Sequence, residues 1–84
     1  MVYKEDSSKN KYLEIPLGWD SPKAQLRITY VSKNNTVRLN KSDEENHIYP
    51  GPEFDYESIP KLIEVLAKIS NDKNNATIPY KINC

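Results

Sequence analysis

Apolar residues recur at helical spacing in one part of the chain, the stretch 58–70. The stripe consists of Ile59, Leu62, Ile63, Leu66 and Ile69, with Lys61, Glu64 and Lys68 on the other side. This spacing predicts a single amphipathic helix with one apolar face. Because a lone helix of this length is only marginally stable in water, we expect it to cover an apolar sheet.

The start of this helix has two candidate caps, Asp55 and Ser58. Proline is tolerated only in the first helical turn, so Pro60 favours Ser58 as the N-cap. A cap at Asp55 would require a kink near Ile59. The helix is expected to end in the Asn-rich stretch 70–75.

Strict alternation of apolar and polar residues predicts strands upstream of the helix. The inward positions are Leu13, Ile15 and Leu17 in 12–17, Leu26, Ile28 and Tyr30 in 24–33, and Val37 and Leu39 in 36–40. Asn34-Asn35 predicts a tight turn, which makes 24–40 a hairpin. We expect Tyr30 to be buried opposite Leu39, and Val31 to oppose Arg38 on the outer face.

The predicted fold class is therefore α+β. An antiparallel sheet of three to four strands is covered on one face by the single helix. Ile48-Tyr49 can begin a short strand that ends at the proline pair around Gly51, and 77–82 can form a short C-terminal edge strand. Residues 1–10 are expected to be a flexible arm, and 11–84 a single small domain.

Composition narrows the function classes. Twelve basic and twelve acidic side chains give a net charge of zero, so the global charge favours no particular polyanion or membrane. Cys84 is the only cysteine, which excludes an intrachain disulfide, and its expected state is a free thiol. The polar N-terminus lacks an apolar signal-like region, so we expect a cytoplasmic protein.

No catalytic or cofactor motif is recognisable, and we predict a non-enzymatic protein without cofactor or metal. The chain has one histidine, His47, and two glycines, too few for a glycine-rich phosphate loop. His47 with Asp43, Glu44 and Glu45 can in principle bind a metal weakly and support hydrolysis, but the pattern is more typical of a solvated loop.

Charge is segregated along the chain. Lys23, Arg27, Lys33, Arg38 and Lys41 occur without an intervening acid. Arg27 and Arg38 are predicted on the sheet face away from the helix, together with Tyr12. Such a face is typical of single-stranded nucleic-acid binding, for which we select Arg27, Arg38, Lys33 and Tyr12. The alternative is a solvated face in which Glu14 pairs with an arginine.

The next segment is acidic, and the chain is rich in tyrosine. Acidic residues without Lys or Arg run from Asp43 to Glu57. Exposed tyrosines favour interfaces because they bring large contact area at low entropic cost. The alternative function is a phage or mobile-element protein that inhibits a host defence or transcription protein. Its interface residues would be Asp43, Glu44, Glu45, Tyr49, Glu53 and Tyr56.

Residues 50–66, PGPEFDYESIPKLIEVL, combine a glycine-containing segment with a helix that carries an early proline. This pattern resembles the end of small bacterial and phage members of the transcriptional positive-coactivator (whirly-related) family. The resemblance implies a curved four-stranded sheet followed by a helix, a homodimer, and single-stranded DNA binding through basic and aromatic residues of the sheet. Arg27, Arg38, Lys33 and Tyr12 would carry that binding here.

Overall fold

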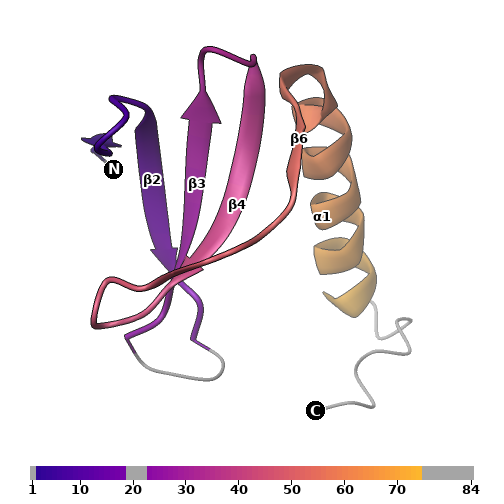
Figure 1. Cartoon of the computed structure of the whole chain (residues 1–84). Helices are drawn as coiled ribbons and strands as arrows, with labels where there is room; N and C mark the ends of the chain where they lie inside the picture. The colour runs from indigo at the N-terminus through magenta and orange to yellow at the C-terminus, as the bar shows by residue number, and fades with distance from the viewer. Residues whose placement is uncertain (1, 19–22, 75–84) are drawn as a thin grey trace.

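The computed structural model describes residues 2–18 and 23–74, which form one curled antiparallel sheet and one α-helix (Figure 1). The elements are β1 (Lys4–Glu5), β2 (Lys11–Pro16), β3 (Gln25–Val31), β4 (Thr36–Ser42), β5 (Ile48–Tyr49), β6 (Glu53–Asp55), a 3-10 turn η1 (Tyr56–Ser58) and α1 (Ile59–Asn74). The order is β1-β2-β3-β4, and both β5 and β6 pair with β4. The α+β class is confirmed, with more strands than the three to four expected.

The long hairpin of β3 and β4 keeps the predicted faces but not the predicted register. Tyr30 lies opposite Val37, and Val31 lies opposite Thr36. The expected partners Leu39 and Arg38 are wrong by two residues. The cause is a four-residue turn, 32–35, in which Asn35 adopts a φ of 53°. Because side chains alternate with a period of two, this slip leaves every residue on its predicted face.

The segment expected to be a flexible arm contains a short hairpin. Residues 4–5 pair with 11–12 of β2. The backbone N–H of Asp6 donates to the carbonyl of Asn10 at 2.9 Å, and one carboxylate oxygen of Asp6 accepts from the N–H groups of Ser8 and Asn10 at 2.9 and 2.8 Å. Lys9 takes the left-handed conformation that closes the turn, with φ 67°. Local turn chemistry therefore adds β1 to the sheet edge.

The helix is attached to the sheet at its N-terminal end. The N–H of Tyr56 donates to the carbonyl of Asn35 at 3.1 Å, and the rings of Tyr56 and Tyr30 meet edge to face at 5.5 Å. Asp55 caps η1, and α1 then begins at Ile59 with Pro60 as its second residue. The prediction that α1 begins at Ile59 with Pro60 second is confirmed, but the prediction of Ser58 as the N-cap is wrong. Asp55 is the cap, because the 3-10 turn takes the place of the kink that this cap would have required.

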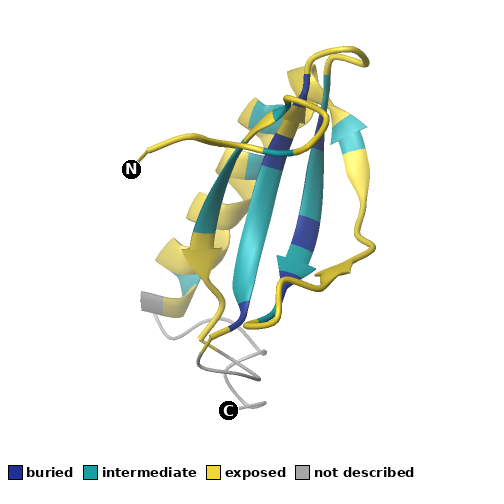
Figure 2. Cartoon of the chain, turned by 60° about the vertical axis from the view of Figure 1, so that its left-hand side comes forward, coloured by how far each residue is buried: buried dark blue, intermediate teal, exposed yellow. Residues whose placement is uncertain are grey.

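The sheet and helix leave the apolar side of the molecule poorly covered (Figure 2). Among the described residues, the buried hydrophobic side chains are Ala24, Val31 and Val37, and no large side chain is fully buried. Tyr30, expected in the core, is 38% exposed, because its ring packs only edge to face on Tyr56 and its hydroxyl reaches out to Asn35 Oδ1 at the exposed turn. No described helix has the length and hydrophobicity needed to cross a membrane. The predictions for the strand 77–82 and for Cys84 lie outside the described residues.

Candidate binding surfaces

The strands divide the sheet into a polar face and an apolar face. The polar face carries Tyr12, Glu14, Arg27, Thr29, Arg38, Asn40 and Ser42, and the apolar face carries Leu13, Ile15, Leu26, Ile28, Tyr30, Val37 and Leu39. In the described ranges, the buried polar side chains are those of Thr29, Asn40 and Ser42, all on the polar face. The curled sheet thus shields part of its polar face, where the nucleic-acid site was predicted.

Arg27 is held in a network centred on Glu14. Its Nε lies 3.0 Å from Glu14 Oε2, and its guanidinium lies 4.0 Å from the centroid of the Tyr12 ring. Ser42 Oγ donates to the same carboxylate oxygen at 3.0 Å, and Lys4 Nζ lies 3.5 Å from the other. The side chains of Arg27 and Glu14 are only 17% and 14% exposed. The charge of Arg27 is therefore neutralised in a partly desolvated pair.

The electrostatics at Glu14 agree with this geometry. Partial burial raises the pKa of its carboxyl, but the hydrogen bonds from Arg27 and Ser42 and the positive charges of Arg27 and Lys4 outweigh the burial. The net result is a pKa below the ordinary value of a glutamate. Glu14 is therefore ionised at neutral pH, and it takes the Nε donor of Arg27 and neutralises the charge that would attract a phosphate.

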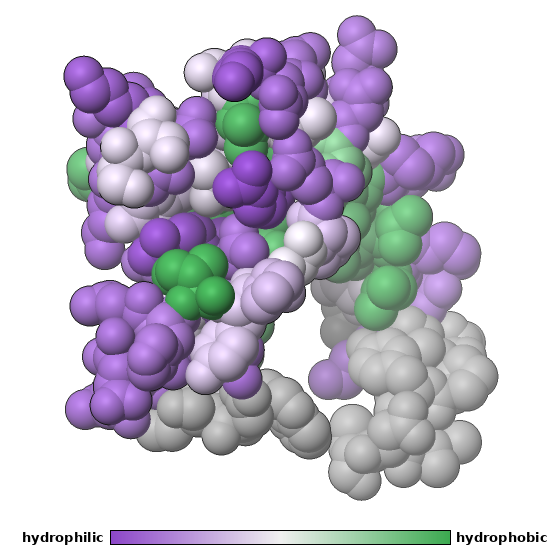
Figure 3. Space-filling model, in the orientation of Figure 1, coloured by the Kyte–Doolittle hydropathy of each residue, from purple (hydrophilic) through white to green (hydrophobic). Residues whose placement is uncertain are grey.

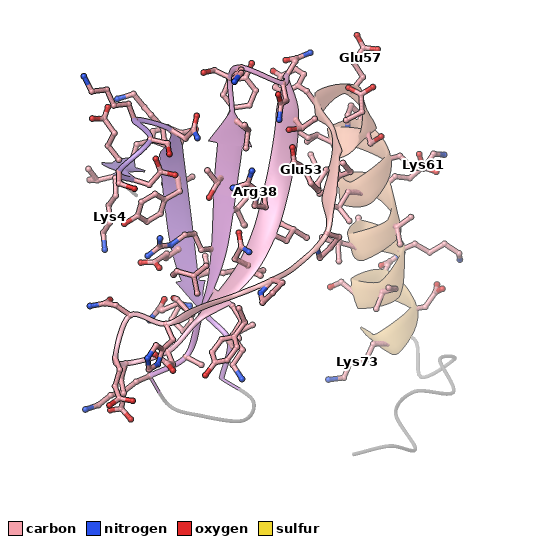
Figure 4. All side chains as sticks on the ribbon, viewed as in Figure 1. Lys4, Arg38, Glu53, Glu57, Lys61 and Lys73 are labelled. Atoms are coloured by element: carbon pink, nitrogen blue, oxygen red, sulfur yellow. The ribbon has the colours of Figure 1, made fainter. Side chains whose placement is uncertain are left out.

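Arg38 is neutralised in the same way, by Glu53 of β6 (Figure 4). Its Nε lies 3.1 Å from Glu53 Oε1, while Thr36 Oγ1 and Asn34 Nδ2 donate to Oε2. These hydrogen bonds, from Thr36 first and then from Arg38 and Asn34, lower the pKa of Glu53. This pair is more open than the first, since the Arg38 side chain is 39% exposed.

The structure therefore brings together part of the predicted nucleic-acid site. Tyr12 and Arg27 stack on each other, and Arg38 lies on the same face, in the neighbouring strand to Arg27. Lys33 lies apart, exposed in the turn between β3 and β4. Each arginine has a carboxylate partner, as in the solvated-face alternative for Glu14. Glu53 could not be assigned to Arg38 from the sequence, because β6 was not predicted.

The predicted acidic and tyrosine-rich interface divides into two groups. In the β4–β5 loop, one oxygen of Asp43 accepts from the backbone N–H groups of Glu45 and His47 at 2.9 Å each. Its other oxygen accepts from Tyr49 Oη at 3.0 Å and lies 3.1 Å from His47 Nδ1. Glu44 pairs with Lys23 at 3.2 Å. The second group, Glu53 and Tyr56, belongs to β6 and η1.

Asp43 organises its loop by these contacts. Burial acts to raise the pKa of Asp43, but the hydrogen bonds from His47, Tyr49 and Glu45 lower it to about 2. The hydrogen bond to Asp43 in turn raises the pKa of Tyr49. Ligand atoms of Asp43, Glu45 and His47 lie within 4.8 Å of one another and offer a cation three ligands. Both Asp43 oxygens already serve the loop, which explains the cluster without a metal.

An apolar groove between α1 and the sheet was not predicted. One hollow of about 420 Å³ is lined by Leu39, Pro52, Phe54, Ser58, Lys61, Leu62 and Val65. A second, of about 290 Å³, shares Leu39, Phe54 and Leu62 and continues over the apolar face to Leu13, Ile28 and Tyr30. Of the helical stripe, only Ile59 and Leu62 are half-buried against the sheet. The rest of the stripe does not fill the space over the sheet, and this leaves the groove open.

Beyond its first turn, the stripe of α1 has no cover among the described residues. Ile63 and Leu66 are 61% and 56% exposed, and Val65 and Ile69 are also exposed. Hydrophobic side chains are visible over α1 on the right of Figure 3, beside the largely hydrophilic surface of the strands. In the sequence, this surface is indicated by the apolar stripe of the helix. We expected the sheet of the same chain to cover the whole stripe.

Comparison of the chain with protein-family models, with curated proteins and with solved structures found no match. The function is therefore inferred from these surfaces alone.

Proposed function

We propose that the chain is a non-enzymatic protein-binding module that docks another protein chain in the groove between α1 and the apolar face. The observation that carries this proposal is the uncovered half of α1, where Ile63, Val65, Leu66 and Ile69 are all exposed. Soluble monomers rarely expose contiguous apolar patches of more than a few hundred Å², and larger ones mark interaction sites.

The charges around the groove indicate what kind of partner fits. Lys61 pairs with Glu64 at 3.3 Å, and Lys68 pairs with Asp72 at 2.9 Å, so four of the five charged side chains of α1 neutralise one another and Lys73 adds one positive charge in the last turn. The groove then offers hydrophobic burial without a strong field to steer a charged ligand. A partner that presents an apolar helix or sheet face meets this chemistry.

Purification from the source cells tests the proposal. A tagged full-length chain is recovered together with whatever protein binds it, and the same is done for Leu66→Glu and for Asn71→Glu. Asn71 is exposed on the side of α1 opposite the stripe, so it receives the same charge outside the groove. We expect a stoichiometric partner with the wild type and Asn71→Glu and its loss with Leu66→Glu. Equal recovery with all three, or no partner with any, contradicts the proposal.

Single-stranded nucleic-acid binding by the polar face is the second candidate. The observation in its favour is the solvent access of Arg38 on the face that also holds the stacked pair of Tyr12 and Arg27. A phosphate would have to displace Glu53 from Arg38. Glu53→Gln should therefore tighten binding to a labelled single strand in fluorescence anisotropy, and Arg38→Ala should weaken it. Absence of binding at low salt refutes this candidate.

A further inference from the structure

We infer that the occupant of the groove is a second copy of this chain. In the resulting two-fold dimer, the C-terminal half of α1 from each copy packs into the groove of the other. This inference rests on the proposed function and names its partner. Three observations support it. The helix α1 needs another surface to cover its apolar stripe, one chain presents both an uncovered helix half and an uncovered part of the sheet, and the exposed apolar area can be compared with that of a dimer interface.

First, α1 needs cover whenever the chain is folded. A helix of 16 residues is marginal in water, and this one contains the β-branched residues Ile63, Val65 and Ile69 together with Ser70 and Asn71. Its two internal ion pairs contribute only about 0.3–0.5 kcal/mol each. A partner that covers α1 must therefore be available in the same amount as the chain when the chain folds. A second copy of the chain always is, because both copies are made together.

Second, each copy presents both halves of the contact. The start of α1 is attached at the β3–β4 turn through Asn35, so the helix runs from there toward the opposite end of the sheet. At that end, Ile15 lies opposite Leu26, on the apolar face and beyond the residues that line the groove. The uncovered half of the helix and the uncovered part of the sheet thus lie on one side of the molecule. Two copies related by a two-fold axis cover both at once.

Third, the exposed apolar area is about half of what a dimer interface uses, before the groove itself is counted. An aromatic side chain has about 200 Å² and an aliphatic one about 120 Å², and about half of this is exposed in the six that flank the groove, which leaves roughly 400 Å². Covering the half-buried groove floor adds to this total. A standard interface uses about 800 Å² per partner. The six side chains are Ile15, Tyr30, Ile63, Val65, Leu66 and Ile69.

The charge distribution permits self-association. The chain has a net charge of zero, and four of the five charged side chains of α1 pair within the helix, which leaves only the positive charge of Lys73 in its last turn. Two identical surfaces with a net charge would repel each other across a two-fold axis, because each charge meets its own copy. Here the contact brings together apolar stripes flanked by neutral ion pairs.

Sedimentation equilibrium of the purified full-length chain tests the inference. We expect the mass of two 9.7 kDa chains at high concentration and a melting temperature that rises with concentration. Leu66→Glu should raise the dissociation constant by about 100-fold or more, because two carboxylates would be buried without partners. Asn71→Glu should leave it unchanged.

A single-chain mass and a melting temperature independent of concentration overturn the inference. A dimer that Leu66→Glu leaves intact also overturns it, since another surface would then form the contact. If Leu66→Glu prevents folding, the concentration dependence of the wild-type melting temperature still decides. A purified monomer that recovers a different, Leu66-dependent partner from cells refutes the second copy and keeps the proposed function. A purified monomer without any such partner refutes both.

Discussion

Gly51 supports a close crossing between the β5–β6 connection and β4. A Cβ added at this position would lie 1.8 Å from the carbonyl oxygen of Leu39 and 2.9 Å from its carbonyl carbon. Both are backbone atoms in the middle of a strand, so no side-chain rotation relieves the overlap. Gly51→Ala must therefore move the connection away from β4.

The cost of that movement can be worked from the contacts it breaks. The N–H of Leu39 donates to the carbonyl of Pro52 at 2.9 Å, and Asn40 Nδ2 donates to the carbonyl of Tyr49 at 2.9 Å. The first bond contributes about 1 kcal/mol, and leaving the buried amide of Asn40 unpaired costs about 1–3 kcal/mol. We expect Gly51→Ala to lower the free energy of unfolding by about 2–4 kcal/mol, a large part of the total for so small a domain.

Urea unfolding followed by circular dichroism measures this change, and Gly18→Ala is the matched control. Gly18 has a φ of +71°, but within the described part of the chain no atom beyond its two sequence neighbours lies within 4 Å of its added Cβ. That variant should cost only about 1 kcal/mol of backbone strain. A Gly51→Ala variant that is as stable as the wild type, or no less stable than Gly18→Ala, would refute the described crossing.

Three further predictions concern polar contacts. Glu14→Gln should lower the free energy of unfolding by about 1–2 kcal/mol because it removes the charge that balances partly buried Arg27, and Glu53→Gln should cost less; equal losses by urea unfolding would contradict this. Asn35→Ala and Asn35→Gly both remove the hydrogen bond that Tyr30 Oη donates to Asn35 Oδ1, but only alanine adds strain at the φ of 53°, so Asn35→Ala should cost about 1 kcal/mol more than Asn35→Gly; the reverse order would contradict it. Asp43 has a pKa of about 2 when folded, so its stabilisation is present above about pH 4 and is lost as the pH falls toward 2. Asp43→Asn should therefore flatten the pH dependence of the urea midpoint in this range, and an unchanged slope would count against the loop geometry.

The sequence predicted the elements whose signals are local and repeated. Period-two alternation identified the faces of β3 and β4, and the helical stripe together with Pro60 identified the start of α1. The register failed by two residues because it depends on the turn conformation at Asn35, which the alternation does not encode. A slip of two residues preserves both faces, so nothing in the pattern opposed the wrong pairing.

The rest depends on contacts distant in sequence. Neither β6 nor its Glu53–Arg38 pair could be predicted, because the proline and glycine residues at 50–52 predicted only an end to β5. The segregation of basic and acidic residues along the chain suggested separate charged surfaces. In the folded chain, Glu14 instead pairs with Arg27, and Glu53 pairs with Arg38. The exposure of Leu66 and Ile69 could not be predicted either, because an apolar stripe does not specify whether its own chain or another one covers it.

Hydrogen exchange along α1 tests the central claim, that the uncovered half of this helix is a docking surface filled by a second copy. Amide exchange of residues 63–73 is measured on the purified full-length chain at high and at low protein concentration. We expect slow exchange at high concentration and much faster exchange on dilution, while the β3–β4 pairing stays more protected. Exchange along α1 that is equally fast, or equally slow, at both concentrations would contradict the account.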